Sequence, residues 1–156
     1  MEDYVIIEGG KINYILSSTP NNSNIEEYST FLQSNNVKYL VNVGGSEYNT
    51  HNLEGKDIIY RQIDYKDGGI PDVKIIDQWE DICKDSISES KNIAIHCISG
   101  MGRAPTLICF SLICYEKYSP VESVEYVREK RKNSLNSIQL KYILNLRDKH
   151  KNCIIC

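Results

Sequence analysis

A short apolar strand pattern, a loop with two glycines and an apolar helix pattern follow one another directly in residues 92–118. The strand reads Asn92-Ile93-Ala94-Ile95, and a helix is predicted from Ala104 through Tyr118. The eight residues between them are His96-Cys97-Ile98-Ser99-Gly100-Met101-Gly102-Arg103. Because this loop leads straight into a helix, it must lie at the helix N-terminus, and the rest of the chain has to hold it there.

This position makes the loop a predicted anion site. Unpaired N–H groups at a helix start and the positive end of the helix dipole attract a dianionic phosphate. Gly100 and Gly102 have no Cβ, so consecutive amides can turn inward and approach a phosphate closely. The residues expected to bind the phosphate are Ile98, Ser99, Gly100, Met101, Gly102 and Arg103.

Cys97 stands at the base of this predicted ring of amides and is the candidate nucleophile. A helix N-terminus and nearby cations favour the thiolate form of a cysteine, so we expect Cys97 to be largely ionised. The planar fork of Arg103 matches two oxygens of a phosphoryl group and stabilises charge in the transition state. The alternative is that Cys97 is only a small buried apolar residue. His96 is expected to orient the loop rather than exchange protons with a substrate.

Size and charge narrow the possible classes. The chain has 156 residues and a formal net charge of −3, which fits one domain with a three-layer core and gives no argument for nucleic acid. The longest apolar run, residues 107–115, is too short to cross a bilayer, and Met1 is not followed by a basic leader, so an intracellular protein is expected. The six cysteines should be reduced, and without zinc-ligand spacing no metal or cofactor is expected.

The N-terminal part of the chain is predicted to alternate strands and helices. Residues 4–8 and 12–16 predict a hairpin, and residues 24–34 predict an amphipathic helix capped by Asn24. The continuous apolar run Val37–Val43 predicts a central strand buried on both faces, and residues 58–60 predict the next strand. Residues 46–56, between these two strands, are polar and contain glycine.

A loop with two carboxylates and two glycines, residues 63–71, follows the last of these strands. Cleavage of a phosphate ester needs a proton for the departing oxygen, so a carboxylic acid on a closing loop is the expected partner of Cys97. Asp67, beside Gly68, is the first choice, and Asp64 is the second. The alternative is that both are solvated turn residues.

Three further helices are expected besides the one that follows the glycine loop. Asp72 caps a helix to about Ser86, Ser119 opens a capping box with proline in the first turn, and Ser137 caps a last helix to about Arg147. The basic run of residues 128–132 closes the second of these helices. It is interpreted as cations that complement a helix C-terminus on a solvated face, rather than as a binding patch.

Cys-x5-Arg preceded by His, between a strand and a helix, is similar to the signature of the cysteine-based protein tyrosine phosphatases. Within them, the chain resembles the phosphatase of regenerating liver (PRL) family, also called type IVA, over nearly its whole length. The segments that carry this are Tyr39-Leu40-Val41-Asn42-Val43, Asp67-Gly68, His96-Cys97-x5-Arg103-Ala104-Pro105, Val127-Arg128-x-Lys130-Arg131 and Asn136-Ser137-x-Gln139-Leu140. The resemblance implies an α/β, three-layer protein-tyrosine-phosphatase-like fold whose central, mostly parallel twisted sheet is flanked by helices. It also implies a phosphatase domain over residues 1–147 and a basic tail over residues 148–156.

The resemblance also assigns roles. The family's nucleophile, phosphate arginine and general acid carry over to Cys97, Arg103 and Asp67. Most cysteine phosphatases have Ser or Thr after the arginine, whose hydroxyl helps the thiolate leave; Ala104 matches the PRL family and implies slow turnover. Members usually have a second cysteine that forms a reversible disulfide with the nucleophile, but Gly44 stands there, so another thiol such as Cys83 would have to substitute.

The C-terminal residues end in Cys153-Ile154-Ile155-Cys156, which fits the prenylation box that the family carries, with Cys153 as the prenylated residue. Basic residues before it would attract anionic lipid. A prenylated and methylated lipoprotein on the cytoplasmic face of the plasma or endosomal membrane is therefore expected. Cys156 leaves the prenyl type open, and the alternative is a tail with a Cys-x-x-Cys pair or two idle thiols.

Two functional hypotheses follow. The leading one is a slow protein tyrosine phosphatase that hydrolyses phosphotyrosine, with phosphoserine and phosphothreonine as further substrates, through a phosphocysteine on Cys97. Ile98 and Met101 stand where lipid phosphatases for polyphosphorylated inositols tend to have lysines, which argues against a highly charged lipid. The alternative is a binding module whose cleft docks a partner protein, for which the resemblance implies a cyclin M-type magnesium transporter.

Overall fold

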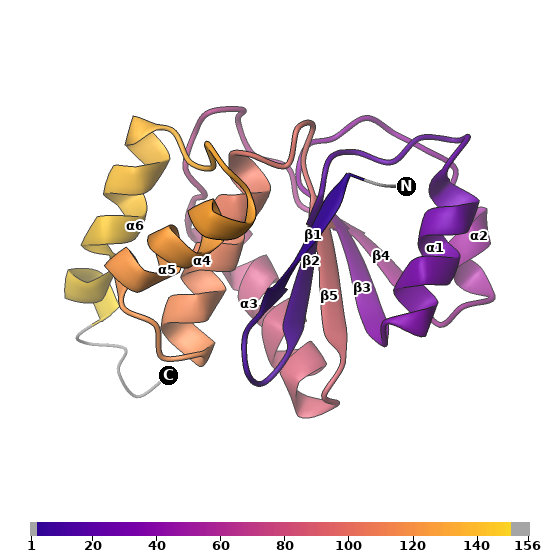
Figure 1. Ribbon diagram of the computed structural model, residues 1–156, viewed down its shortest axis with the longest axis horizontal. Helices are drawn as coiled ribbons and strands as arrows, with labels where there is room; N and C mark the ends of the chain where they lie inside the picture. Colours follow the sequence, from indigo (N-terminus) through magenta and orange to yellow (C-terminus); the bar gives the residue numbers. More distant parts are fainter. Residues whose placement is uncertain (1–2, 151–156) are drawn as a thin grey trace.

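The computed structural model describes residues 3–150, with the side chains of residues 3–146. Its strands are β1 (Tyr4–Glu8), β2 (Asn13–Ser17), β3 (Val37–Asn42), β4 (Ile59–Gln62) and β5 (Asn92–His96). Its helices are α1 (Ile25–Ser34), α2 (His51–Glu54), α3 (Val73–Ser88), α4 (Arg103–Tyr115), α5 (Pro120–Lys130) and α6 (Ser137–His150). The sheet forms a middle layer, with α1 and α2 on one face and α3 to α6 on the other (Figure 1).

The sheet has the strand order β1-β2-β5-β3-β4. β1 and β2 pair antiparallel, as the predicted hairpin, whereas every other neighbouring pair is parallel. β5 is therefore the middle strand, and Ile93, Ala94 and Ile95 are fully buried because layers cover both faces. The predicted fold class, a three-layer α/β fold with a mostly parallel sheet, is confirmed. The loop after β5 begins at the carboxyl edge of the parallel strands, the usual place for a ligand site in such sheets.

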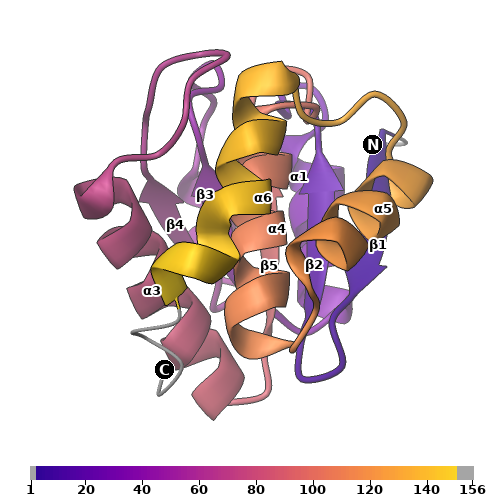
Figure 2. The same ribbon diagram turned by 90° about the vertical axis from the view of Figure 1, so that its left-hand side faces the viewer.

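The helix that follows this loop lies at the centre of the layer formed by α3 to α6. Every residue of α4 from Arg103 to Leu112 is buried. α6 lies in front of α4 when the molecule is seen from that side (Figure 2). Trp79 of α3 donates its indole N–H to the Leu107 carbonyl at 2.9 Å and to Ser111 Oγ at 2.6 Å. The N-terminus of α4, and with it the loop, is held by packing on several sides.

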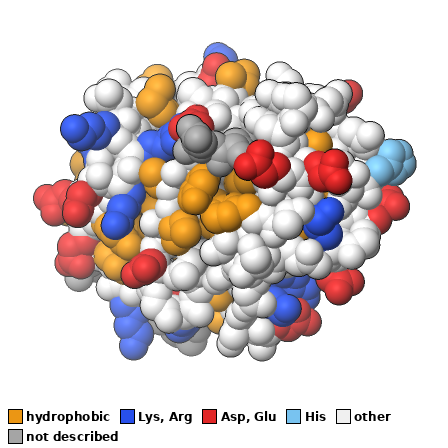
Figure 3. Space-filling model, turned by 45° about the vertical axis from the view of Figure 1, so that its right-hand side comes forward, with side chains coloured by type: hydrophobic (Ala, Val, Ile, Leu, Met, Phe, Trp, Pro, Cys, Tyr) orange, Lys and Arg blue, Asp and Glu red, His pale blue; other side chains and the backbone are white. Residues whose placement is uncertain are grey.

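The opposite face of the sheet has its own, smaller core beneath α1. Ile25, Tyr28 and Leu32 of this helix are buried against it. At its margin the rings of Tyr4 on β1 and Phe31 on α1 lie with centroids 4.5 Å apart. Figure 3, which brings this side forward, shows hydrophobic side chains gathered in the middle of the visible face. This layer supports the sheet from behind the strands that lead to the loop.

The N-terminal half contains one helix that was not predicted and one cap that was predicted wrongly. The polar segment after β3 contains the short helix α2, which one buried residue, Leu53, attaches to the core. Asn24 precedes α1 as predicted, yet its side chain does not cap the helix. Its Oδ1 instead accepts a hydrogen bond from the Asn21 N–H at 2.8 Å, within the turn that precedes the helix.

The caps of α3 and α5 were predicted correctly, and the cap of α6 was not. Asp72 accepts from the Ile75 N–H at 2.9 Å, and Ser119 accepts from the Glu122 N–H at 3.1 Å. α6 is capped by Asn136, one residue before the predicted Ser137, and runs to His150 rather than to Arg147.

Candidate active site

The glycine loop connects the middle strand of the sheet to its most buried helix. β5 ends at His96, and α4 begins at Arg103. The Val43 N–H donates to the His96 carbonyl at 2.8 Å, which ties the start of the loop to the end of β3. This is the predicted succession of strand, loop and helix. The strand end and the helix start lie within one residue of the prediction, and the helix ends at Tyr115 rather than at Tyr118.

Hydrogen bonds from neighbouring segments hold the carbonyls of this loop on its outer side. Thr19 donates its hydroxyl to the Cys97 carbonyl at 2.7 Å and its N–H to the Ile98 carbonyl at 3.1 Å. Arg131 donates to the Ser99 carbonyl at 2.6 Å, and the Leu135 N–H donates to the Met101 carbonyl at 2.8 Å. Within residues 3–150, the N–H groups of residues 98–102 donate to no protein acceptor. They are therefore available to an anion, as the sequence predicts.

Cys97 and Arg103 begin and end the loop, and both are almost closed to solvent. Cys97 is 2 % exposed and Arg103 is 6 % exposed. One guanidinium nitrogen of Arg103 donates to the Tyr65 carbonyl at 3.2 Å, and the Tyr65 hydroxyl donates to the Arg103 carbonyl at 2.6 Å. The other terminal nitrogen lies 3.6 Å from Asp67 Oδ1. Arg103 thus links the glycine loop, residues 96–103 (the phosphate loop), to residues 63–71, which carry the candidate acid (the acid loop).

Gly44 provides the space in which this guanidinium lies. A Cβ added to Gly44 would be 2.0 Å from Arg103 Nη1, far inside any permitted contact. Its φ of +92° is also a backbone conformation that side chains other than glycine rarely adopt. A cysteine at this position would not fit beside Arg103 as it lies here, because the guanidinium occupies the room that a side chain would need.

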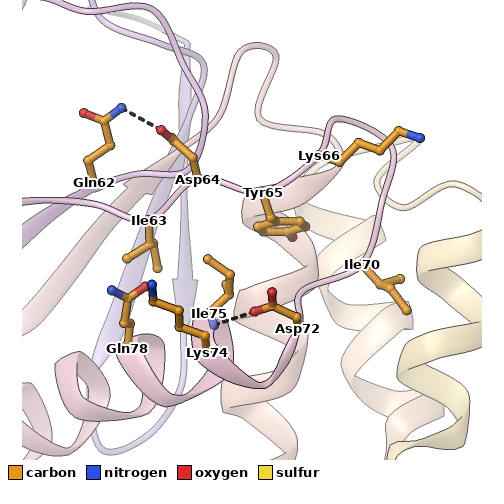
Figure 4. Close-up of a pocket in the computed structure, with 10 residues that line it drawn as sticks. All are labelled: Gln62, Ile63, Asp64, Tyr65, Lys66, Ile70, Asp72, Lys74, Ile75 and Gln78. Carbon is orange, nitrogen blue, oxygen red and sulfur yellow. Dashed lines mark hydrogen bonds between the residues drawn. The ribbon is translucent and has the colours of Figure 1, made fainter.

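The two candidate acids lie in different surroundings. Asp67 pairs with Arg103, and its side chain is 81 % exposed. Asp64 accepts a hydrogen bond from Gln62 Nε2 at 2.8 Å and lines a cavity of about 470 Å³ between the acid loop and α3 (Figure 4). Of the two carboxylates, Asp67 is the one that contacts the phosphate loop.

His96 is buried directly before Cys97, at the end of β5. Its Nε2 lies 2.6 Å from the Tyr48 hydroxyl. Burial lowers the pKa of His96 to about 4, and a weaker contact with the backbone of Cys97 opposes this shift. The imidazole is therefore neutral at pH 7, which fits a role in orienting the loop. Tyr48 was not predicted, because nothing in its polar segment distinguishes it from a surface tyrosine.

The basic run at the end of α5 does more than complement a helix terminus. Arg131 binds the Ser99 carbonyl of the loop and also pairs with Asp3 at 2.8 Å. Arg128 donates to the carbonyls of Ser134 and Leu135 at 2.8 and 3.1 Å. The interpretation as a solvated face was wrong for these two arginines. Arg131 holds the loop at Ser99, and Arg128 holds the segment whose Leu135 N–H donates to the Met101 carbonyl.

Similarity to known proteins agrees with this geometry. Residues 20–152 match the family description "Dual specificity phosphatase, catalytic domain". The chain is 34 % identical to the PRL-1 phosphatase of Drosophila melanogaster over 94 % of this chain and 86 % of that protein. It is 32 % identical to the probable protein tyrosine phosphatase type IVA A of Dictyostelium discoideum, over 94 % and 89 % of the two chains.

The chain belongs to the PRL family of protein tyrosine phosphatases. A solved structure of a putative protein tyrosine phosphatase from Leishmania major superposes with a TM-score of 0.82 at 25 % identity, covering 92 % of this chain and 98 % of that one. The protein is accordingly a protein tyrosine phosphatase with the fold of the dual specificity enzymes.

The position of Cys83 decides whether this PRL family member could form the alternative disulfide with Cys97. Cys83, Cys97 and Cys109, all buried, carry free thiols. Cys83 Sγ lies 3.3 Å from Ser111 Oγ, which is about 12 Å along α4 from Arg103 at 1.5 Å per residue. Cys83 is thus packed against the middle of α4 rather than against the phosphate loop.

The predicted prenylation site, Cys153, lies outside the described residues. Between residues 3 and 150, no helix combines the length and the apolar character that crossing a bilayer requires.

Proposed function

We propose that Cys97 is the nucleophile of this phosphatase and that phosphotyrosine in proteins is its main substrate. The observation that carries the proposal is the arrangement of the loop around Cys97. The loop carbonyls accept hydrogen bonds from surrounding segments, the N–H groups of residues 98–102 donate to no acceptor in the described chain, and Arg103 closes the ring. Such a ring of donors stabilises the charge on a phosphoryl group in transfer.

In the first step the Cys97 thiolate attacks phosphorus, a sulfur–phosphorus bond forms, and the bond from phosphorus to the tyrosine oxygen breaks. Asp67, in its protonated form, gives its proton to the departing oxygen. In the second step a water molecule attacks the phosphocysteine, Asp67 takes a proton from it, and the sulfur–phosphorus bond breaks. The products are inorganic phosphate and the restored thiolate.

The second step is expected to be slow. The position after Arg103 is Ala104, which is fully buried and has no hydroxyl to donate to the departing sulfur. Removal of one hydrogen bond to a developing charge slows a step by about 10²–10³-fold. Thr106 does not take over this role, because its hydroxyl donates to the Gly102 carbonyl at 2.8 Å.

The test is release of inorganic phosphate from a phosphotyrosine peptide. The wild type is expected to release phosphate, and Cys97→Ser is expected to release none. Cys83→Ser is the matched control, since it removes a thiol that is also buried but lies beside Ser111. Phosphate release by Cys97→Ser at the rate of the control would contradict the assignment.

A second function, docking of a partner protein at the same cleft, is favoured by the apolar rim of the site. Ile98 is 56 % exposed and Met101 is 41 % exposed, although both are large and apolar. Exposed apolar side chains in the phosphate loop favour contact with a protein surface over contact with a highly charged lipid headgroup. A cyclin M-type magnesium transporter is the proposed partner. Its capture by Asp67→Ala, with phosphatase activity lost, would support a separate binding role, and loss of capture would contradict it.

Attachment to the cytoplasmic face of a membrane is proposed from the sequence of the tail. Cys153 is followed by two isoleucines and preceded by Lys149 and Lys151, which fits one prenyl chain plus a basic segment. Mass spectrometry of the C-terminal peptide from cells is the test. A prenyl group on Cys153 is expected, and an unmodified peptide would contradict the proposal.

A further inference from the structure

The acid loop places Asp67 at a tight turn. The Gly69 N–H donates to the Lys66 carbonyl at 2.9 Å, so residues 66–69 form a β-turn with Asp67 at its second position. Gly68, the third residue, has a φ of +74°, a conformation that glycine adopts without strain. The backbone at this turn therefore sets the direction of the Asp67 side chain, which is itself mostly in solvent.

On its N-terminal side the turn is attached to the phosphate loop. The Tyr65 hydroxyl donates to the Arg103 carbonyl, and the Tyr65 carbonyl accepts from the Arg103 guanidinium. On its C-terminal side the turn is attached to a different element, the start of α6. Asn136 Nδ2 donates to the Gly68 carbonyl at 2.9 Å, and Gln139 Nε2 donates to the Gly69 carbonyl at 3.1 Å.

Asn136 and Gln139 also form the capping box of α6. The Gln139 N–H donates to Asn136 Oδ1 at 2.8 Å, and the Asn136 N–H donates to Gln139 Oε1 at 3.1 Å. The cap uses only the oxygen of each amide, and serine with glutamate would provide it equally well. The nitrogen of each amide is left over, and both nitrogens bind the acid loop. Capping alone therefore does not explain why both residues are amides.

Gln139 is also close to the phosphate loop. It is 1 % exposed, and a Cβ added to Gly102 would be 3.3 Å from Gln139 Nε2. One buried amide thus lies between Gly102, the residue before Arg103, and Gly69, the last residue of the Asp67 turn. This places the start of α6 where it can fix the distance between the two loops.

We propose that Asn136 and Gln139 are positioning residues for proton transfer, which hold the Asp67 turn against the phosphate loop. The proposal rests on the assignment of Asp67 as the general acid. The two amides bind backbone carbonyls of the acid loop. Their contribution is therefore made through Asp67, in its proton transfer to the leaving group and in its later proton transfer from water.

The test compares two substrates that differ in their need for an acid. Phenyl phosphate releases a phenol as weakly acidic as tyrosine and needs the proton, whereas 4-nitrophenyl phosphate releases a phenolate that leaves without one. The quantity measured is kcat/KM, because it reports transfer to Cys97 even when hydrolysis of the phosphocysteine limits kcat.

The decisive variant is Asn136→Ser. Serine keeps the cap and adds no charge, but it removes the donor to the Gly68 carbonyl. kcat/KM is expected to fall about tenfold for phenyl phosphate and less than twofold for 4-nitrophenyl phosphate, a part of the 10²–10⁴-fold that general acid catalysis supplies. Gln139→Glu keeps the acceptor of the capping box, loses the donor to Gly69, and is expected to show the same selectivity. Inhibition by vanadate reports any effect of its added charge on anion binding.

Ser119→Ala is the matched control for stability. It removes the cap of α5, where Ser119 accepts from the Glu122 N–H, and is expected to slow neither substrate selectively. Asp67→Asn separates the two proposals. If Asp67→Asn slows phenyl phosphate selectively and Asn136→Ser does not, the positioning role of Asn136 is overturned and Asp67 remains the acid. If Asp67→Asn shows no selectivity, the assignment of Asp67 as the acid fails, and the positioning role fails with it.

Discussion

The phosphate loop and the acid loop are held in opposite ways. The phosphate loop is anchored on nearly every carbonyl, and its reactive ends, Cys97 and Arg103, are buried. The acid loop carries an exposed Asp67, and its contacts are made at the flanks, through Tyr65 on one side and the start of α6 on the other. Under the proposed assignment, the more firmly anchored loop carries the nucleophile, and the more exposed loop carries the general acid.

This difference follows from when each group has to act. A thiolate must be stabilised before the substrate arrives, so its donors have to be fixed in advance. The acid must approach the leaving oxygen only after the substrate has entered, so its loop has to tolerate opening. The predictions that follow test each side of the contrast.

The largest effect is expected in the more firmly anchored loop, from Arg103→Lys. Lysine retains the positive charge but cannot bind two phosphoryl oxygens in one plane, nor bind Tyr65 and Asp67 at the same time. We expect kcat/KM for an aryl phosphate to fall about 10³-fold. Arg61→Lys, an exposed arginine on β4, is the control. Equal activity of both variants would show that charge alone is enough.

The next effect is on the free energy of unfolding, and it comes from His96, the buried residue directly before Cys97. Burial lowers the pKa of His96 from its ordinary 6.5 to about 4, so between these values the unfolded chain binds more protons than the folded one. The free energy of unfolding should therefore fall as the pH falls from about 6.5 to 4. At about 1.4 kcal/mol for each pKa unit, the loss attributable to His96 is about 3 kcal/mol.

Urea unfolding at a series of pH values measures this. His96→Asn should remove most of the dependence over that window, whereas His51→Asn, which changes an exposed histidine on α2, should leave it intact. If the free energy of unfolding depended on pH equally in the wild type and in His96→Asn, the assignment of this dependence to His96 would be wrong.

A smaller effect on kcat/KM is expected from a change at Gly44, which lies against the guanidinium of Arg103. Gly44→Ala places a Cβ against the guanidinium, so kcat/KM should fall about 30-fold, or about 2 kcal/mol, and vanadate should bind more weakly. Gly10→Ala is the matched control, because Gly10 also has a positive φ but faces only the flexible Glu116 side chain. If both variants lose activity alike, strain rather than the position of Arg103 is the cause.

The smallest effect is an increase. Ala104→Ser supplies a hydroxyl near the departing sulfur and should raise the steady-state rate about tenfold by speeding hydrolysis of the phosphocysteine. The burst rate, which reports transfer to Cys97, should not change. A steady-state rate that stays the same or falls would show that another step limits turnover.

The two loops also differ in how far the sequence predicts them. The phosphate loop is local in sequence, and the run from Asn92 to Tyr115 contains its strand, its glycines, its nucleophile and its helix. The choice of Asp67 over Asp64 depended on a neighbouring glycine, and the reason appears only in the fold, where Gly68 lies at a turn and Arg103 lies beside Asp67.

The remaining contacts could not be predicted, because they join segments that are distant in the chain. Gln139 binds Gly69 across 70 positions, and Arg131 binds Ser99 across 32 positions. Periodicity reports which face of a helix is apolar, but it does not report which loop lies beside the first turn. The cap of α6 was predicted at Ser137 and lies at Asn136, and nothing in the sequence indicated that the amides of Asn136 and Gln139 also bind the acid loop.

The most direct measurement is the intact mass of the protein after brief incubation with an aryl phosphate and quenching in acid. The account predicts a gain of one phosphoryl group on the wild type and on Cys83→Ser, mapped to Cys97, and no gain on Cys97→Ser. A phosphoryl group on any other residue, or an equal gain on Cys97→Ser, would contradict the claim that this loop holds the nucleophile.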